Sequence, residues 1–312
     1  MKQVACVLIS FLAAGALAQS FPVQNQRRSD VIYMDQPTGI ALSDYLVAWP
    51  SLAPIIDRLN AAQSAAVEAD LRRRAPALSD GEWNLLAQLA WQRGALDEAD
   101  LATANAVALG PAQPLNAFQQ AMVCFAHLRR ASGMFEQWKW QQRTRDAYQR
   151  TFDLDPHNLS ARYYLAYTYM NTPWFGGGDT KKALALSEGG VALGQAGFYV
   201  VRADAHRLRG ELDAANADYD TAIESRAFKL SGFLDAAREE MGRRHWDRAR
   251  RYLDWAIYCR PDSSLAWEEL GDYYLATHDP QRALRAYQTA VQRDQNNESP
   301  REKLAKLTPS TR

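Results

Sequence analysis

The chain has 312 residues, of which 47% are hydrophobic, 11% aromatic and 23% charged. Thirty-six Lys and Arg residues balance 36 Asp and Glu residues, so the formal net charge is zero. This balance argues against a nucleic-acid binder held mainly by attraction to phosphates, and the apolar content argues against a largely disordered chain.

The N-terminus has the pattern of a signal peptide. Lys2 provides a short positive region, residues 4–12 form an apolar run too short to span a bilayer, and Ala16-Leu17-Ala18 is an A-x-A cleavage site. The alternative is a buried N-terminal helix. We expect residues 1–18 to be removed and the mature chain to be exported, with the periplasm of a Gram-negative bacterium as its location. No other stretch predicts a membrane span.

Two cysteines, Cys124 and Cys259, remain in the mature chain. A single disulfide is possible in an exported protein, but both residues lie in helical patterns far apart in the sequence. We expect two buried thiols, because free cysteine packs as a small apolar residue.

Residues 19–50 contain three prolines and show no helical period, which predicts a partly ordered arm. Residues 54–74 then predict one helix that covers the N-terminal end of the fold.

A period of 34 residues runs through the C-terminal half of the chain. Bulky and small residues recur together at this interval, with no gap between copies. The recurring sets are Tyr199, Phe233 and Trp267; Ala203, Ala237 and Gly271; Ala215, Ala249 and Ala283; Tyr219, Leu253 and Tyr287; and Ala222, Ala256 and Ala290. An earlier copy begins at Trp83 and has Ala87, Ala99, Thr103 and Ala106 at the same offsets. Small residues at fixed positions let paired helices approach closely while the aromatic residue fills the remaining gap.

This pattern resembles the tetratricopeptide repeat (TPR). The resemblance is carried by Trp267, Leu270, Gly271, Tyr274, Ala283, Tyr287 and Ala290. It implies an all-α, right-handed α-α superhelix of about six to seven helix pairs over residues 51–307. The clearest repeats are 80–111, 159–194 with an inserted loop, 196–229, 230–263 and 264–297, and residues 299–307 form a polar capping helix.

Turn residues agree with this interpretation. Gly94 and Gly210 stand where a left-handed residue ends the first helix of a pair. Asp97, Asp213 and Asp247 each stand just before a second helix, and we expect them to be N-caps. Asp279-Pro280 is expected to do the same in the last pair, and the segment from Ser299 to Glu302 has the spacing of a capping box.

The repeat pattern is looser between residues 112 and 194. Helices are expected at 115–130 and 135–152, and the loop 173–179 is an insertion. Its glycines lack the order of a phosphate-binding loop, so we expect a helix-to-helix turn with Trp174 or Phe175 packed against neighbours. Basic residues lie between aromatic ones at 138–145 and cluster again at 243–251. They could bind an anionic surface, but nearby acidic residues favour solvated helix faces.

The sequence predicts no enzyme, no catalytic residue, no metal site and no cofactor. The five histidines are not at metal-ligand spacing, and no HExxH, CxxC or GxSxG motif occurs.

What remains is a binding surface. In the TPR family the first helix of each pair, helix A, lines a concave face. Carried onto this chain, the resemblance gives a partner-binding groove of Trp91, Tyr163, Tyr167, Asp204, Arg207, Arg238, Glu268 and Asp272. We expect a non-enzymatic scaffold that binds a protein or peptide and not nucleic acid; the oligomeric state is not predicted. The alternative is a small-ligand-binding protein or an enzyme, with a pocket within residues 112–194 that includes Tyr163, Tyr167, Trp174 and Phe175.

Overall fold

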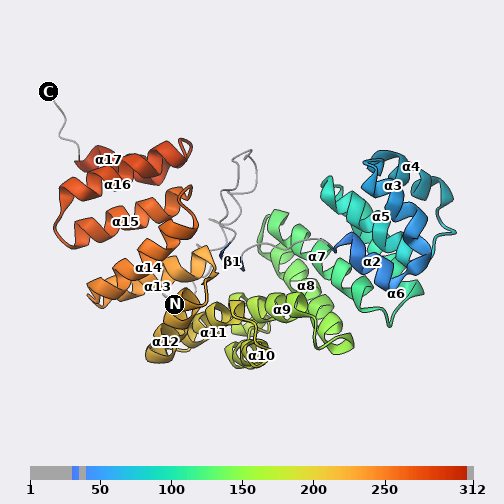
Figure 1. Cartoon of the computed structure of the whole chain (residues 1–312), viewed down its shortest axis with the longest axis horizontal. Coiled ribbons are helices and arrows are strands. Elements are labelled where there is room, and N and C mark those ends of the chain that lie inside the picture. The colour runs from blue at the N-terminus through green and yellow to red at the C-terminus, as the bar shows by residue number, and fades with distance from the viewer. Residues whose placement is uncertain (1–29, 35–39, 308–312) are drawn as a thin grey trace. The chain divides into compact units, whose positions relative to one another are not determined.

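A computed structural model describes residues 30–34 and 40–307, and Figure 1 shows the chain as α-helices joined by short turns. The expected all-α class is confirmed, with one small addition: two strands of two residues each form a parallel pair. The described residues divide into two compact units, one of residues 40–190 and one of residues 30–34 and 191–307. The expected signal peptide, residues 1–18, lies outside the described residues.

The N-terminal unit is a series of antiparallel helices in which α5 packs on α6, α6 on α7, α7 on α8 and α8 on α9. Its elements are α2 (Leu42–Ala48), the short 3-10 helix η1 (Pro50–Leu52), α3 (Ala53–Asn60), α4 (Ser64–Arg74), α5 (Asp80–Gln92), α6 (Leu96–Leu109), α7 (Pro114–Arg130), α8 (Met134–Leu154), α9 (Leu159–Asn171), the 3-10 helix η2 (Trp174–Gly176) and α10 (Thr180–Ala192).

One expectation for the N-terminal region is wrong. Residues 54–74 do not form one helix, because the chain turns between α3 and α4 with Ala62 at a positive φ of 58°. Within the expected arm, Leu42–Ala48 form α2, although the sequence there showed no helical period. Tyr45 of α2 is fully buried and donates a hydrogen bond of 2.7 Å from its Oη to Oδ1 of Asn84 in α5.

The C-terminal unit consists of helix pairs, with α11 packed on α12, α13 on α14 and α15 on α16. Its elements are β1 (Ile32–Tyr33), α11 (Gly197–Leu208), α12 (Leu212–Glu224), β2 (Ala227–Phe228), α13 (Leu230–Gly242), α14 (Trp246–Cys259), α15 (Ser264–Ala276), α16 (Pro280–Arg293) and α17 (Glu298–Leu307). Helix α17 packs on α16.

The residues of the 34-residue period lie in the core, as the periodicity predicts. Every recurring Ala is at most 2% exposed, and Tyr219, Leu253 and Tyr287 are fully buried. One contact of this kind joins α15 to α16, where a Cβ added to Gly271 would overlap the Tyr287 ring. Small residues are therefore required where the paired helices cross.

The strand pair fastens an N-terminal segment to the C-terminal unit. Ile32 and Tyr33 pair in parallel register with Ala227 and Phe228, which link α12 to α13. Tyr33 also donates from Oη to the backbone oxygen of Cys259 at 2.9 Å and meets the Phe228 ring edge-on. The sequence analysis predicted no strand here.

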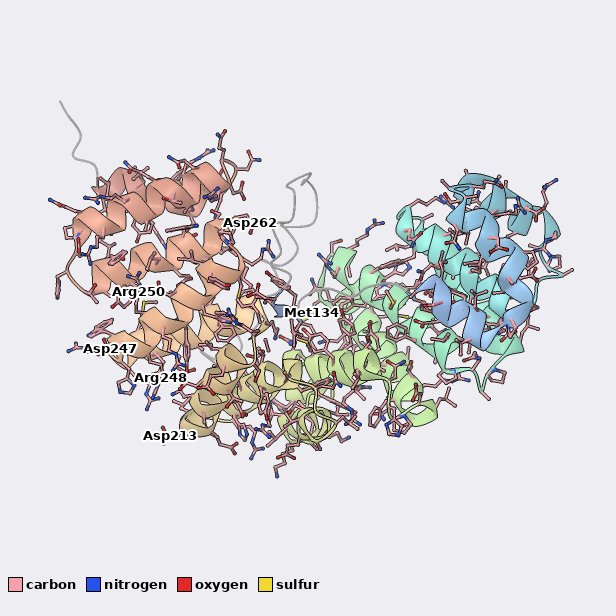
Figure 2. The ribbon with its side chains drawn as sticks, in the orientation of Figure 1. Met134, Asp213, Asp247, Arg248, Arg250 and Asp262 are labelled. Carbon is pink, nitrogen blue, oxygen red and sulfur yellow. The ribbon has the colours of Figure 1, made fainter. Side chains whose placement is uncertain are left out.

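The expected left-handed glycines are confirmed, whereas most of the expected N-caps are wrong. Gly94 and Gly210 have φ of 81° and 77°. After Gly94 the amide of Ala95 bonds back to Ala90, and α6 begins at Leu96, so Asp97 lies inside the first turn. Asp213 and Asp247 are likewise in the first turns of α12 and α14 (Figure 2). Their negative charge interacts favourably with the helix dipole, but neither side chain caps its helix.

At the last pair and beyond it, one cap is confirmed and one is wrong. Asp279 caps α16 by accepting from the amide of Arg282 at 3.0 Å. Helix α17 begins at Glu298, so the expected capping box from Ser299 does not form. The expectation of two buried thiols is confirmed for Cys124 and Cys259.

Substitution of Gly271 by Ala tests the close helix contact. We expect G271A to lower the free energy of unfolding by about 1–3 kcal/mol, because the added methyl group collides with the Tyr287 ring. G242A is the matched control, since Gly242 ends α13 and a methyl group added there would have no heavy atom within 4 Å; it should be neutral or raise stability by up to about 1 kcal/mol. Urea unfolding followed by circular dichroism measures both, and equal costs would contradict the contact.

Candidate functional site

The charged residues that the TPR resemblance assigned to the groove lie on the first helices of three successive pairs, α11, α13 and α15. Asp204 and Arg207 are on α11, Arg238 is on α13, and Glu268 and Asp272 are on α15. Helix α13 contacts both α11 and α15, so these side chains belong to one stretch of the C-terminal unit. Most of them are bonded within that unit.

Asp204 is a buried structural residue. Its carboxylate accepts hydrogen bonds of 2.5 Å from Tyr219 Oη and from Lys229 Nζ, and all three residues are buried. Burial by itself raises the pKa of Asp204, but the charges of Lys229 and Arg207 outweigh it and hold that pKa below its usual range. Asp204 therefore fixes the start of α13 to α11 and is not available to a partner.

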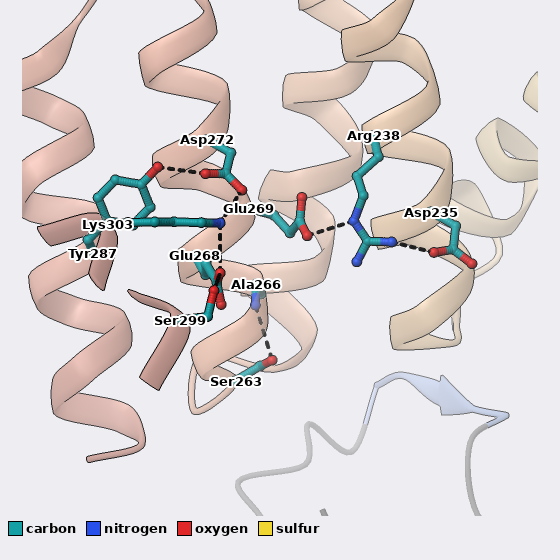
Figure 3. Close-up of polar contacts among 10 residues, drawn as sticks. All are labelled: Asp235, Arg238, Ser263, Ala266, Glu268, Glu269, Asp272, Tyr287, Ser299 and Lys303. Atoms are coloured by element: carbon teal, nitrogen blue, oxygen red, sulfur yellow. Dashed lines mark hydrogen bonds and ion pairs between the residues drawn. The ribbon is translucent and has the colours of Figure 1, made fainter. Parts of the chain in front are cut away.

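Arg207 and Arg238 are partly exposed and share the carboxylate of Asp235. Arg207 lies 3.3 Å from it, and Arg238 lies 2.6 Å from its other oxygen. Arg238 also donates from Nε to Glu269 of α15 at 2.6 Å, so it bridges two successive pairs (Figure 3). Burial raises the pKa of Glu269 above its usual range, against the lowering effect of Arg238.

Glu268 and Asp272 hold the capping helix. Lys303 of α17 reaches both carboxylates at 2.7 Å, and Ser299 donates from Oγ to Glu268 at 2.5 Å (Figure 3). Tyr287 adds a 2.6 Å hydrogen bond to Asp272. Ser299 thus fastens α17 to α15 through its hydrogen bond to Glu268 and is not an N-cap.

The charges on this stretch do not cancel. Six carboxylates are joined by ion pairs to four cationic groups, which leaves an excess of two negative charges; the members are Asp204, Asp235, Glu239, Glu268, Glu269, Asp272, Arg207, Lys229, Arg238 and Lys303. Five of these members were not predicted from the sequence: Lys229, Asp235, Glu239, Glu269 and Lys303. Asp235 was detectable, since it stands three residues before Arg238 on the same helix.

The remaining predicted groove residues lie in the N-terminal unit. Trp91 of α5 packs against a small cluster with Ala99 and Val123. Tyr163 is only 8% exposed, and its ring meets the Tyr164 ring edge-on at 4.9 Å. Tyr167 is half-buried beside Phe125 of α7. The contact between Tyr167 and Phe125 joins α9 to α7.

The two basic segments are mostly paired internally. In residues 138–145, Arg143 forms an ion pair with Asp100 at 3.1 Å and covers the Trp140 ring, which stacks on His127. In residues 243–251, Arg243, His245 and Arg248 converge on the buried Glu240 (Figure 2 labels Arg248). Internal pairing agrees with the interpretation that these are not open anion sites.

The side chain of Trp174 in the inserted loop is 85% exposed. The side chain of Phe175 lies outside the described residues, so the expected packing of Trp174 or Phe175 stays a prediction. The loop rests on α8 through a 3.0 Å hydrogen bond from Arg145 to the backbone oxygen of Gly176. In the C-terminal unit, a pocket of about 10 Å³ beside Arg207 has room for about one water molecule.

Within residues 30–34 and 40–307 no cluster of three or more His, Cys, Asp or Glu side chains is arranged to hold a metal ion. In the same ranges, no helix has both the length and the apolarity needed to cross a membrane.

Comparison with known proteins identifies the repeat. Residues 234–298, from α13 into α17, match the tetratricopeptide repeat family. Residues 234–298 therefore carry tetratricopeptide repeats. This confirms the resemblance, and TPR helix pairs are a fold of protein-interaction scaffolds. No curated protein sequence matches the chain.

Solved structures share the fold at low identity. A TPR protein from Parabacteroides merdae is 15% identical, with a TM-score of 0.58 over 85% of this chain and 98% of that chain. The C-terminal part of a TPR repeat-containing protein from Cytophaga hutchinsonii is 15% identical, with a TM-score of 0.50 over 79% and 96%. A chain of the APC/C hetero-tetramer Cut9-Hcn1 is 12% identical, with a TM-score of 0.56 over 78% and 46%.

Replacement of Lys229 by Met tests the role assigned to Asp204. At pH 7 we expect K229M to lower the free energy of unfolding by about 3–5 kcal/mol, because it leaves a buried carboxylate without its cation. Chemical unfolding across pH 3 to 7 measures this cost.

The pH dependence has a defined sign. In the unmodified chain the pKa of Asp204 is depressed on folding, so its contribution is present above the unfolded pKa of about 4 and is lost as the pH falls. In K229M the cost should shrink toward pH 3, because protonation removes the unpaired charge. A cost that stays the same across this range would assign the effect to lost packing.

Proposed function

We propose that the chain is an exported scaffold that binds a protein or peptide partner through the helix-A face of its C-terminal unit. We define this face as the surface of α11, α13 and α15 that carries Arg207, Asp235, Arg238, Glu239 and Glu269. The proposal rests on one observation, the row of partly exposed charges with its excess of carboxylates.

These ion pairs are weak enough to exchange. The side chains of Arg238 and Asp235 are 49% and 38% exposed, and an ion pair at such exposure contributes about 0–1 kcal/mol. A partner that supplies its own cations can therefore replace them at little cost. The negative excess favours a segment that carries Lys or Arg.

The face also offers apolar contact. Leu275, in the last turn of α15, is 38% exposed. A basic segment with an interspersed apolar residue matches both features. A similar fold occurs in a complex, the Cut9-Hcn1 hetero-tetramer, which supports the use of such helix pairs for binding proteins.

Reversing charge on α13 tests the face. We expect D235K/E239K to weaken capture of partners by about tenfold or more, because two attractive carboxylates become repulsive toward a basic segment. E224K/E302K is the control, since both residues are exposed and outside the face. Partners are captured from the native host with crosslinking and quantified by mass spectrometry.

The proposal holds if proteins retained by the unmodified chain and by E224K/E302K are lost with D235K/E239K. It fails if all three chains, each with the same helicity, capture the same proteins.

Export is tested by the mass of the mature chain. Expressed in a Gram-negative host, the protein should appear in the periplasm with the mass of a chain that begins at Gln19. Replacing Ala16 and Ala18 by Leu removes the small residues of the cleavage site and should leave the precursor uncut. An uncut, unmodified chain in the cytoplasm would overturn the export proposal.

A further inference from the structure

The second pocket of the C-terminal unit lies away from the helix-A face. It has a volume of about 350 Å³ and is lined by α14, α15 and α16, with second helices of two successive pairs as its sides. Its size falls at the lower end of the range for ligand-binding pockets. Its lining combines guanidinium groups, aromatic rings and an apolar floor.

Positive charge predominates in this pocket. The lining contains Arg250, Arg282 and Arg285 against the single carboxylate of Asp254. Arg250 is engaged, since it donates from Nε to Asp254 at 2.8 Å. Arg285 is exposed, and no ion pair of Arg285 is found among residues 30–34 and 40–307.

The guanidinium of Arg282, the third arginine of the pocket, is held loosely. Arg282 lies 3.4 Å from Asp279, and its side chain is 65% exposed. Arg282 and Arg285 are three residues apart on α16, so they lie on one side of the helix and can reach the same ligand. Guanidinium groups placed in this way bind carboxylates through paired hydrogen bonds.

The aromatic residues are fixed in place. Arg250 and Arg282 lie over the Tyr274 ring at 5.3 and 5.8 Å, and Arg250 also bonds to its hydroxyl. Trp267 donates from Nε1 to the backbone oxygen of Pro261 at 3.0 Å. The buried Leu270 lies in the pocket lining between these rings on α15. A preformed apolar surface thus adjoins the exposed guanidinium groups of Arg282 and Arg285.

We propose that this pocket, the helix-B groove, binds an acidic peptide segment in which carboxylates flank an aromatic or aliphatic side chain. The carboxylates meet Arg282 and Arg285, and the apolar side chain lies against Trp267 and Leu270. The C-terminal unit then has two faces of opposite preference, since its helix-A face carries an excess of carboxylates. The groove does not depend on the function proposed above.

Fluorescence anisotropy with defined peptides tests the groove. The probe is a labelled Gly-Glu-Phe-Glu-Leu-Glu-Gly peptide, and its counterpart has Gln in place of each Glu. We expect the full chain to bind the acidic peptide, with an affinity that falls as NaCl is raised. R282A/R285A should weaken binding by about tenfold or more.

The control R293A/R301A removes two exposed arginines outside the pocket and should bind like the unmodified chain. R282A keeps the backbone amide that donates to Asp279, so the cap of α16 is preserved. R285E is a second variant, at a residue for which no ion pair is found among the described residues. D235K/E239K should leave this binding intact, which separates the groove from the helix-A face.

The proposal is overturned if the acidic peptide does not bind at millimolar concentration, if the Gln peptide binds equally well, or if both arginine pairs give the same loss. Binding of 3-phenylpropionate as tight as that of the peptide would also overturn it, in favour of a small-molecule site.

Discussion

The C-terminal unit depends on the contact between a small residue on one helix and a bulky residue on its neighbour. Gly271 meets the Tyr287 ring where α15 crosses α16, and fully buried Ala residues occupy the equivalent positions in the other pairs. A larger side chain at these positions would separate the helices and expose apolar surface. Because this contact is repeated in each pair, it fixes which side of each helix faces its partner and which sides remain at the surface.

The polar surface follows from that arrangement. Once each pair is fixed, α13 and α15 carry charges toward each other, and Arg238 of α13 bridges them through its ion pair with Glu269 of α15. On the side of α14 and α16 the guanidinium groups gather instead, with Tyr274 between them. One stack of helices therefore offers an acidic face and a basic groove, and such a stack can hold two segments of unlike charge.

The fold was predictable from the sequence because its main signal is local and repeats. The small residues at 203, 237 and 271 and the bulky ones at 219, 253 and 287 recur at one interval, and each is buried. The cap expected at Asp97 failed for a geometric reason: the turn after Gly94 bonds back into α5, so α6 begins earlier than an aspartate cap requires.

The candidate site was less predictable because its contacts join distant residues. Lys229 reaches Asp204 across 25 positions and Lys303 reaches Asp272 across 31, and no motif spacing marks such pairs. The hydrogen bond from Tyr33 to the backbone oxygen of Cys259 joins residues 226 positions apart. A strand of only two residues leaves no sequence pattern that would reveal it. The predicted groove residues lie on the first helices of their pairs, but the resemblance did not show that Asp204, Glu268 and Asp272 have internal partners.

A double-mutant cycle between Gly271 and Tyr287 tests the central contact most directly. Unfolding free energies of G271A, Y287L and the double variant give the coupling between the two positions. Leu at position 287 removes the ring that a methyl group at 271 would strike, so G271A should cost about 1–2 kcal/mol less in the Y287L background. Additive costs, with no coupling, would contradict the account.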